Sequence, residues 1–414
     1  MLRQKLLHNK ICENFKSLSE WYQKKGDDLA FPIYSSFDIR DSGEKIAPVD
    51  ANIFPAGFNN ICDVDKENTI ELLSAYLKKH YPQVSNNIVL LTEEHTQNAY
   101  YWENVYTIKS LIEKTGYKCQ VAIPRELSEP LKVKSVNGHE LTVYSAEKIS
   151  GKIIVNGTEP ELIINNNDFS SDYSSWIEGL EASINPPFRL GWFWRRKESF
   201  FMQYNSVVEQ FCEIIDLPSS YLQVKTEPFK GFDINNEDSR EELAKKVDLF
   251  LDEIKNDYEK FNISSKPYAF IKNSSGTYGL GVTKVDSGND IREWSYKSRK
   301  KMKAAKGGGG FNEVIIQEGI PTKYKTDNET AEPAIYLISR RLAGGFLRTH
   351  NKKGADDNLN SPGAVYKRLC VSDLKIDIAK CPLENVYGWV AKLGVLAIAI
   401  EAQEASIPFI GYKQ

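Results

Sequence analysis

The stretch that decides the fold reads FIKNSSGTYGLGV and runs from Phe270 to Val282. Its first half has the apolar and aromatic composition of a β-strand, and that strand ends at Lys272. The loop that follows is built from small residues, among them Ser275, Gly276, Gly279 and Gly281. Because glycine has no Cβ, such a loop can turn sharply and expose several N–H groups to an anion, and Lys272 would add positive charge for nucleotide phosphates. We interpret the stretch as a phosphate-binding hairpin. An ordinary hairpin turn remains the alternative, since the spacing matches neither the P-loop nor the dinucleotide fingerprint.

The length and net charge of the chain limit the classes of protein to which it can belong. At 414 residues the chain is long enough for two or three domains of roughly 150 residues each. A net charge of -3 provides no basic field for nucleic acid, and we find no apolar stretch near the roughly 20 residues that cross a bilayer. Residues 1–25 have the apolar spacing of a helix and lack the apolar block of a signal peptide. We therefore expect a cytoplasmic protein with no nucleic-acid or membrane partner.

The six cysteines are scattered along the chain, and no two of them form a Cys-x-x-Cys pair. This pattern indicates neither a zinc site nor a disulfide framework. We expect the cysteines to be reduced and structural.

The N-terminal half predicts a sheet with polar residues at its edges. Residues 87–123 follow the strand-helix-strand pattern of a parallel βαβ unit. Residues 131–155 alternate short strand-like runs with turns and predict a small inserted sheet. A proline pair at 186–187 then stops regular structure, so we predict a first domain over residues 1–185 and a second over 186–414.

Several polar residues of the first domain are candidates for substrate binding. Residues 31–60 read as extended chain, in which Arg40 could meet a carboxylate and Asp38 or Asp50 an ammonium group. Asn167 and Asp168 follow a short buried strand, where open α/β sheets place ligands. The alternative for both groups is a set of polar side chains that satisfy nearby backbone atoms in turns.

Taken in order, the segments after the Lys272 hairpin resemble the ATP-grasp superfamily. They are the strand ending in Gln317-Glu318-Gly319, the run Gly344–Arg348 and the segment Asn358–Ala364. More closely, the chain is similar to the proteobacterial glutamate-cysteine ligases that resemble glutathione synthetase. The strings that carry this similarity are FDIR at 37–40, APVDANIFPAGFNN at 47–60, NND at 166–168, GW at 191–192, RRK at 195–197 and NLN at 358–360.

The resemblance implies an α/β chain with an ATP-grasp fold behind an N-terminal parallel-sheet domain, and a lid subdomain at about 198–285. It implies a ligase that uses ATP and Mg²⁺ to join the γ-carboxylate of glutamate to the amine of cysteine through an acyl phosphate. Lys197 and Lys272 would hold the nucleotide phosphates, and Gln317, Glu318 and Gly319 would face adenine and ribose. Arg348 would meet the γ-phosphate. Asn52 and Asn59, within the matching strings, join the candidate substrate residues.

The metal ligands are less well defined by the resemblance. The closing Glu-x-Asn pair of the superfamily is not evident near the C-terminus, so the candidates are Glu332, Asn358 and Asn360. That departure keeps two alternatives open, namely another ATP-grasp carboxylate-amine ligase and a non-catalytic nucleotide-binding protein of the same fold. The sequence leaves assembly into a homo-oligomer open as well.

Overall fold

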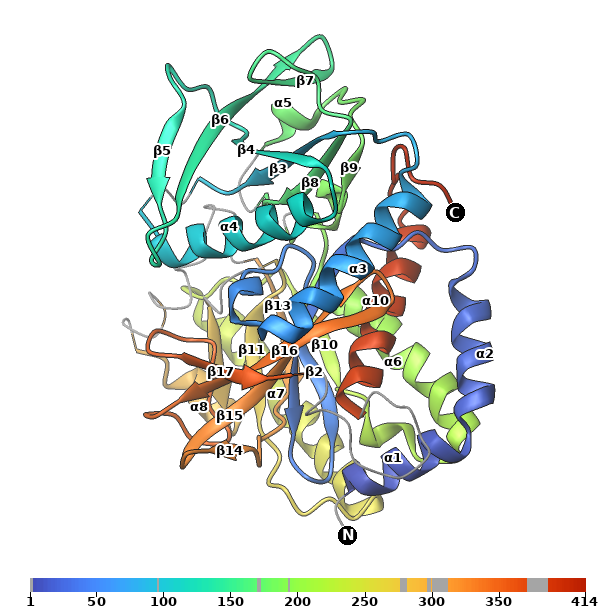
Figure 1. Ribbon diagram of the computed structural model, residues 1–414. Coiled ribbons are helices and arrows are strands. Elements are labelled where there is room, and N and C mark those ends of the chain that lie inside the picture. Colours follow the sequence, from blue (N-terminus) through green and yellow to red (C-terminus); the bar gives the residue numbers. More distant parts are fainter. Residues whose placement is uncertain are drawn as a thin grey trace.

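Three β-sheets organise the part of the chain that the computed structural model describes (Figure 1). The described residues are 3–94, 97–169, 173–192, 194–275, 281–295, 299, 312–370 and 386–414. We refer to the sheets as the central sheet, the parallel sheet and the lid sheet.

The central sheet is antiparallel, and its strands come from both ends of the chain. Its strand order is β17-β16-β15-β1-β2, with β14 paired to β15. The strands are β1 (Tyr34–Asp41), β2 (Ile46–Asn52), β14 (Lys325–Thr326), β15 (Glu329–Ile338), β16 (Arg341–His350) and β17 (Val365–Leu369). The predicted boundary at residue 185 lies between β1 and β15 in the sequence, yet the two strands are hydrogen-bonded neighbours from Tyr34↔Ile338 to Asp38↔Ala334. Pro48, which has no N–H to donate, lies in edge strand β2 next to a register shift.

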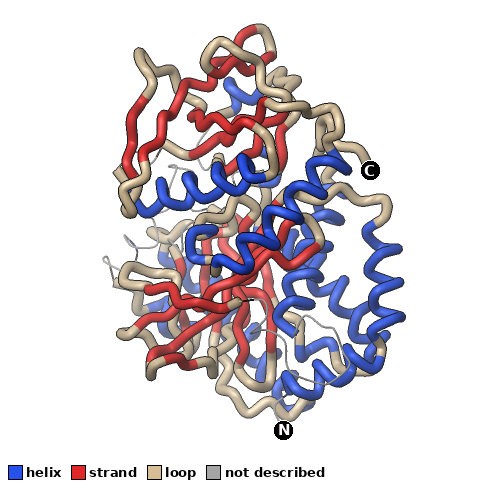
Figure 2. Tube along the Cα trace, viewed as in Figure 1, coloured by secondary structure: helices blue, strands red, loops and turns tan. Residues whose placement is uncertain are grey.

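Alternation along these strands gives the central sheet two different faces. One face carries apolar side chains such as Phe37 and Ile335, which pack with α6 (Lys197–Ile215) and α10 (Val386–Glu404). The other face carries Tyr336 and Phe346, which pack in the core that includes α3 (Asp63–His80). Figure 2 shows the helices gathered beside the central sheet.

The parallel sheet confirms the βαβ unit predicted over residues 87–123. Strand β3 (Asn87–Thr92) pairs in parallel with β4 (Lys118–Ile123), and α4 (Ala99–Lys114) connects them. The other strands are β5 (Leu131–Lys134), β6 (Glu140–Ile149), β7 (Lys152–Val155), β8 (Leu162–Asn166) and β9 (Ile184–Asn185). The prediction of a separate inserted sheet at 131–155 is wrong, because β6 pairs in parallel with β4 and extends the same sheet.

The lid sheet contains both strands of the predicted Lys272 hairpin. Its order is β10-β13-β11-β12, formed by β10 (Thr226–Lys230), β11 (Ala269–Asn273), β12 (Val282–Val285) and β13 (Glu313–Glu318). Strands β11 and β12 are antiparallel, which confirms the predicted hairpin. Helices α7 (Glu237–Lys260) and α8 (Gly288–Arg292) share one hydrophobic core with this sheet. The lid predicted at 198–285 is shifted, since α6 packs on α10 while β13 belongs to the lid sheet.

The remaining helices are short or lie at the N-terminus. They are α1 (Arg3–Glu13), α2 (Phe15–Gly26), α5 (Ser174–Ile177), and the 3-10 turns η1 (Phe58–Asn60), η2 (Phe188–Leu190) and η3 (Ser219–Tyr221). The helix expected near the N-terminus is therefore two helices that meet at Asn14.

Helix α10 corrects the expectation that no segment could span a bilayer. It has 19 residues, and by length and composition it is the one helix in the described part of the chain that could cross a membrane. Yet 83% of its apolar window is buried inside the protein. A buried ion pair between Arg195 and Glu401, with N–O distances of 3.0 and 2.6 Å, anchors it to the start of α6. Packing in the core accounts for its composition.

The expectation of reduced cysteines is wrong for three of them. Cys62 and Cys370 form a disulfide although 308 residues separate them, and Cys12 is also disulfide-bonded. Cys119 and Cys212 are free and buried, as expected. Spacing could not reveal the first pair, because η1 and the end of β17 become neighbours only in the fold.

Candidate functional site

A cavity between the central sheet and the lid sheet brings together many of the predicted site residues. Those that line it are Asp38, Arg40, Asp50, Lys197, Lys272, Glu332, Arg348, Asn358 and Asn360. They come from β1, β2, α6, β11, β15, β16 and the loop between β16 and β17. No single one of these elements could form the site alone.

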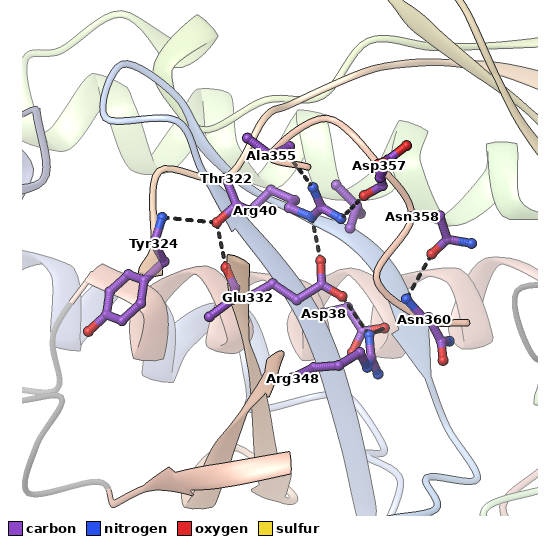
Figure 3. Close-up of polar contacts among 12 residues, drawn as sticks. Asp38, Arg40, Thr322, Tyr324, Glu332, Arg348, Ala355, Asp357, Asn358 and Asn360 are labelled. Atoms are coloured by element: carbon purple, nitrogen blue, oxygen red, sulfur yellow. Dashed lines mark hydrogen bonds and ion pairs between the residues drawn. The ribbon is translucent and has the colours of Figure 1, made fainter. Parts of the chain in front are cut away.

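Four buried charged side chains that line the cavity contact one another (Figure 3). Strand alternation places Asp38 and Arg40 on the same face of β1, and Glu332 is in register with Arg348 across β15 and β16. One Arg348 terminal nitrogen lies 2.7 Å from Glu332 and 2.9 Å from Asp38, and its second terminal nitrogen donates to Asp38 at 3.1 Å. The Arg40 Nε donates to Glu332. Two guanidinium groups thus balance two carboxylates, so the cluster compensates its own charge in the interior.

The two carboxylates differ in their pKa directions. Burial raises the pKa of Asp38, although the Arg348 guanidinium opposes this. Burial also acts to raise the pKa of Glu332, but Arg40 and Arg348 outweigh it and hold that pKa below its usual value. Glu332 is therefore the more firmly ionised carboxylate of the pair.

Arg40 makes contacts that argue against the substrate role predicted for it. Besides Glu332, it donates to the carbonyl oxygens of Ala355 at 3.0 Å and Asp357 at 2.7 Å (Figure 3). Each of its three nitrogens thus has an oxygen acceptor within the chain, and the side chain is 5% exposed. We infer that Arg40 fixes the loop that contains Ala355 and Asp357.

Two lysines enter the cavity from opposite sides. Lys197, at the first turn of α6, lies 2.7 Å from Asp50 and 4.1 Å from the centroid of the Trp192 ring. Lys272, on β11, donates to the Val49 carbonyl at 2.9 Å and the Gln317 side chain at 2.5 Å. Burial acts to raise the pKa of Asp50, but the two lysines lower it below its usual value. Two cations facing one carboxylate leave net positive charge for an anionic ligand.

The lowered pKa of Lys272 should limit the pH range in which a nucleotide binds tightly. Burial lowers its pKa to about 8, even though the Asp50 charge opposes the shift. Above that pH the ammonium group loses its proton, so a nucleotide phosphate loses a cationic partner. We expect the Kd of a non-hydrolysable ATP analogue to rise about tenfold from pH 7 to pH 9, measured by calorimetry without amino acids. The Lys272→Arg variant stays charged and should not show this rise, and an equal rise in both proteins would assign the effect to another group.

The Gln317-Glu318-Gly319 segment is held mainly by its own protein contacts. Glu318 pairs with Lys45 at 2.5 Å and accepts a hydrogen bond from the Tyr258 hydroxyl at 2.8 Å. A Cβ at Gly319 would lie 2.1 Å from the Tyr268 ring, so only glycine fits there. The Glu318 carboxylate is thus used to fix the segment, while Gln317 reaches Lys272.

The candidate metal ligands supply oxygen atoms at one end of the cavity. Glu332 offers a carboxylate, and Asn358 and Asn360 offer side-chain amides. The Asn358 side-chain oxygen accepts a hydrogen bond from the backbone N–H of Asn360 at 3.0 Å, which fixes the Asn358 amide relative to the loop backbone. Carboxylate and amide oxygens are the hard ligands that Mg²⁺ prefers, so the donor set fits that ion.

The other predicted site residues do not line this cavity in the described part of the chain. Asn167 donates to the Thr92 carbonyl at 3.0 Å, as the turn alternative proposed, and Asn59 contacts Asn60 at 3.1 Å. The remaining ones are Asn52 on β2, Asp168 after β8, Ser275 at the end of β11 and Gly281 before β12. Gly276 and Gly279 lie outside the described residues.

The sequence analysis missed the apolar residues of the cavity. Phe270, Val282 and Ile320 line it beside the charged groups. Phe270 and Lys272 are two residues apart on one strand, so strand alternation in the quoted stretch could have placed Phe270 on the same face as Lys272.

Comparisons with known proteins identify the relatives of this chain. The family model described as GshA, glutamate-cysteine ligase, matches residues 8–402. A crystal structure from Methylobacillus flagellatus KT, described as a gamma-glutamylcysteine synthetase, is 30% identical with a TM-score of 0.87 and covers 97% of this chain and 96% of that one. A glutathione synthetase-like effector from Globodera pallida is 12% identical with a TM-score of 0.43, covering 89% of this chain and 85% of that one. A search of curated proteins gives no match. The predicted ATP-grasp fold is confirmed by the family match and the Methylobacillus flagellatus structure.

Proposed function

Because the chain belongs to the glutamate-cysteine ligase family, we propose that its cavity is where ATP drives the joining of the L-glutamate γ-carboxylate to the L-cysteine amine. The observation that carries this placement is the convergence on one cavity of two lysines, two arginines and the three candidate metal ligands Glu332, Asn358 and Asn360. The cavity contains cations that can bind phosphates, polar side chains that can bind the reacting carboxylate, and apolar side chains that can pack against the adenine base.

The chemistry explains why such a cavity needs so much fixed charge. A carboxylate is a poor electrophile, so the γ-phosphoryl group of ATP is first transferred to it and ADP leaves. The cysteine amine then attacks the carbonyl carbon of the acyl phosphate, loses a proton and expels phosphate. Charge gathers on the phosphoryl oxygens in both steps, and preorganised cations stabilise it most effectively in a site that excludes water.

We assign the residues of the cavity to these steps by their positions. Lys272 and Lys197 bind the phosphates, and Phe270, Val282 and Ile320 provide an apolar slot for adenine. We assign Arg348 to the step that activates the carboxylate, because its buried Nε has no hydrogen-bond partner among the described residues and is available to the reacting group.

A magnesium ion would fit beside the same phosphates. Glu332, Asn358 and Asn360 are the residues that would hold it, and the bound ion would neutralise phosphate charge. The chain's own contribution is to keep these oxygens in place, through the hydrogen bonds of Arg40 and Arg348 to Glu332 and through the hydrogen bond from the backbone N–H of Asn360 to the Asn358 side chain.

Phosphate release from ATP is expected to require glutamate and cysteine together. The test incubates the protein with ATP and Mg²⁺ plus glutamate, cysteine, both, or each replaced by another amino acid. Mass spectrometry should then find a γ-linked dipeptide. Phosphate release with another pair of amino acids would keep the fold and change the assigned substrates. The absence of release with every pair would favour a non-catalytic nucleotide-binding protein.

A further inference from the structure

We propose that Lys284 and Asp356 are positioning residues that couple the lid sheet to the loop carrying Asn358 and Asn360. This inference rests on the proposed function, because it assigns that loop to the metal and phosphate end of the cavity. We call residues 351–364, between β16 and β17, the amide loop.

Arg40, on β1 of the central sheet, and Thr322, in the segment between β13 and β14, hold the amide loop through its backbone. Arg40 donates to the carbonyls of Ala355 and Asp357, and the Thr322 N–H donates to Ala355 at 2.8 Å (Figure 3). These contacts lie immediately before Asn358. They fix the position from which both amides enter the cavity, but they involve no residue of the lid sheet.

The lid sheet reaches the same loop through one charged contact. Lys284, on β12, donates to the Asp356 carboxylate, and Asp356 lies between the two residues whose carbonyls Arg40 holds. Lys284 also lies 5.0 Å from the centroid of the Tyr268 ring, which limits the directions its side chain can take.

The contact is placed where movement of the lid sheet would change the cavity. Val282, two residues before Lys284 on β12, lines the cavity, and Lys272 is paired with Val282 across the hairpin. Asn358, two residues after Asp356, also lines the cavity. The Lys284–Asp356 pair therefore joins the strand pair that carries the phosphate-binding lysine to the loop that carries the amides.

The chain provides a matched control for this contact. Lys284 has a second carboxylate partner, Asp286, at 3.5 Å. Asp286 is exposed to a similar extent as Asp356, at 47% against 46% of the side chain, but it belongs to the lid side alone. Replacing either aspartate by asparagine removes the same charge from the same lysine, and only Asp356→Asn disconnects the lid sheet from the amide loop.

Asp356→Asn is expected to raise the dissociation rate of mant-ADP, measured with Mg²⁺ by stopped-flow fluorescence, about fivefold. In the ligation assay it should raise the KM for ATP and the Mg²⁺ concentration for half-maximal rate, with little change in the KM for glutamate. Asp286→Asn should match the wild type in each measurement. The melting temperatures of both variants should stay near that of the wild type, because both side chains of the pair are partly exposed.

A charge exchange completes the test. The double variant Lys284→Asp with Asp356→Lys restores the pair in reverse and should recover most of the mant-ADP residence time that Lys284→Asp alone loses. Equal dissociation rates for Asp356→Asn and Asp286→Asn, or no recovery in the exchange, would overturn the proposal. Since mant-ADP binding needs no turnover, this result is separate from the wild-type ligation assay, whose failure would instead remove the proposed function.

Discussion

Alanine in place of Arg348 is expected to abolish ligation and to destabilise the fold together. The side chain bridges Asp38 and Glu332 in the interior, so its removal leaves both buried carboxylates without the guanidinium group that they share. Breaking a buried ion pair from one side costs about 3–5 kcal/mol of unfolding free energy. Losing a cation that stabilises developing charge should reduce the ligation rate at least about 100-fold. Urea unfolding and phosphate release measure the two effects.

Second-site variants separate the two roles of Arg348. Adding Glu332→Gln or Asp38→Asn to Arg348→Ala removes uncompensated charge, so part of the lost stability should return while ligation should not. Arg341→Ala is the matched control, because Arg341 begins the same strand but is exposed, and its replacement should change stability by less than about 0.5 kcal/mol. Turnover near the wild-type rate in Arg348→Ala would remove Arg348 from the site.

Local patterns in the sequence were sufficient for elements whose partners are close in the chain. The β11–β12 hairpin and the βαβ unit at 87–123 follow from strand composition, glycine positions and helical spacing within short windows. The pairing of β1 with β15, from Tyr34↔Ile338 to Asp38↔Ala334, joins strands from the two ends of the chain, and no local pattern encodes that choice. The same separation hid the Cys62–Cys370 disulfide and the apolar core position of α10.

The site was predictable in its composition but not in its internal pairing. The sequence identified Arg40 and Glu332 as polar residues near a ligand, and both line the cavity. It could not show that they pair with each other, because each residue type serves equally well as a ligand contact or as a structural ion pair. At Asn167 the same ambiguity was resolved the other way, since its side chain binds a backbone carbonyl as turn residues do.

The Lys272→Met variant is expected to lose activity without losing stability. Lys272 is the candidate phosphate cation of the lid sheet, so its loss should lower kcat/KM for ATP about 100- to 1000-fold. Folding should not suffer, because burial lowers the pKa of Lys272 to about 8 and the protein therefore disfavours its charged form. We expect the unfolding free energy of Lys272→Met at pH 7 to equal or exceed that of the wild type. Lys230→Met, an exposed lysine on β10 of the same sheet, should leave both activity and stability unchanged.

The pH dependence of the unfolding free energy tests the expected stability of Lys272→Met in a way that activity measurements cannot. With a folded pKa of about 8 and an ordinary value of 10.5, Lys272 binds more protons in the unfolded chain throughout the interval between them. Stability from this group therefore rises with pH across that interval, and the rise is absent when methionine replaces the lysine. The difference in unfolding free energy between Lys272→Met and the wild type should narrow between pH 8 and 10.5, as urea titrations at each pH would measure. A difference that widens there would mean that the folded protein stabilises the Lys272 charge, and the pH limit expected for nucleotide binding would fail with it.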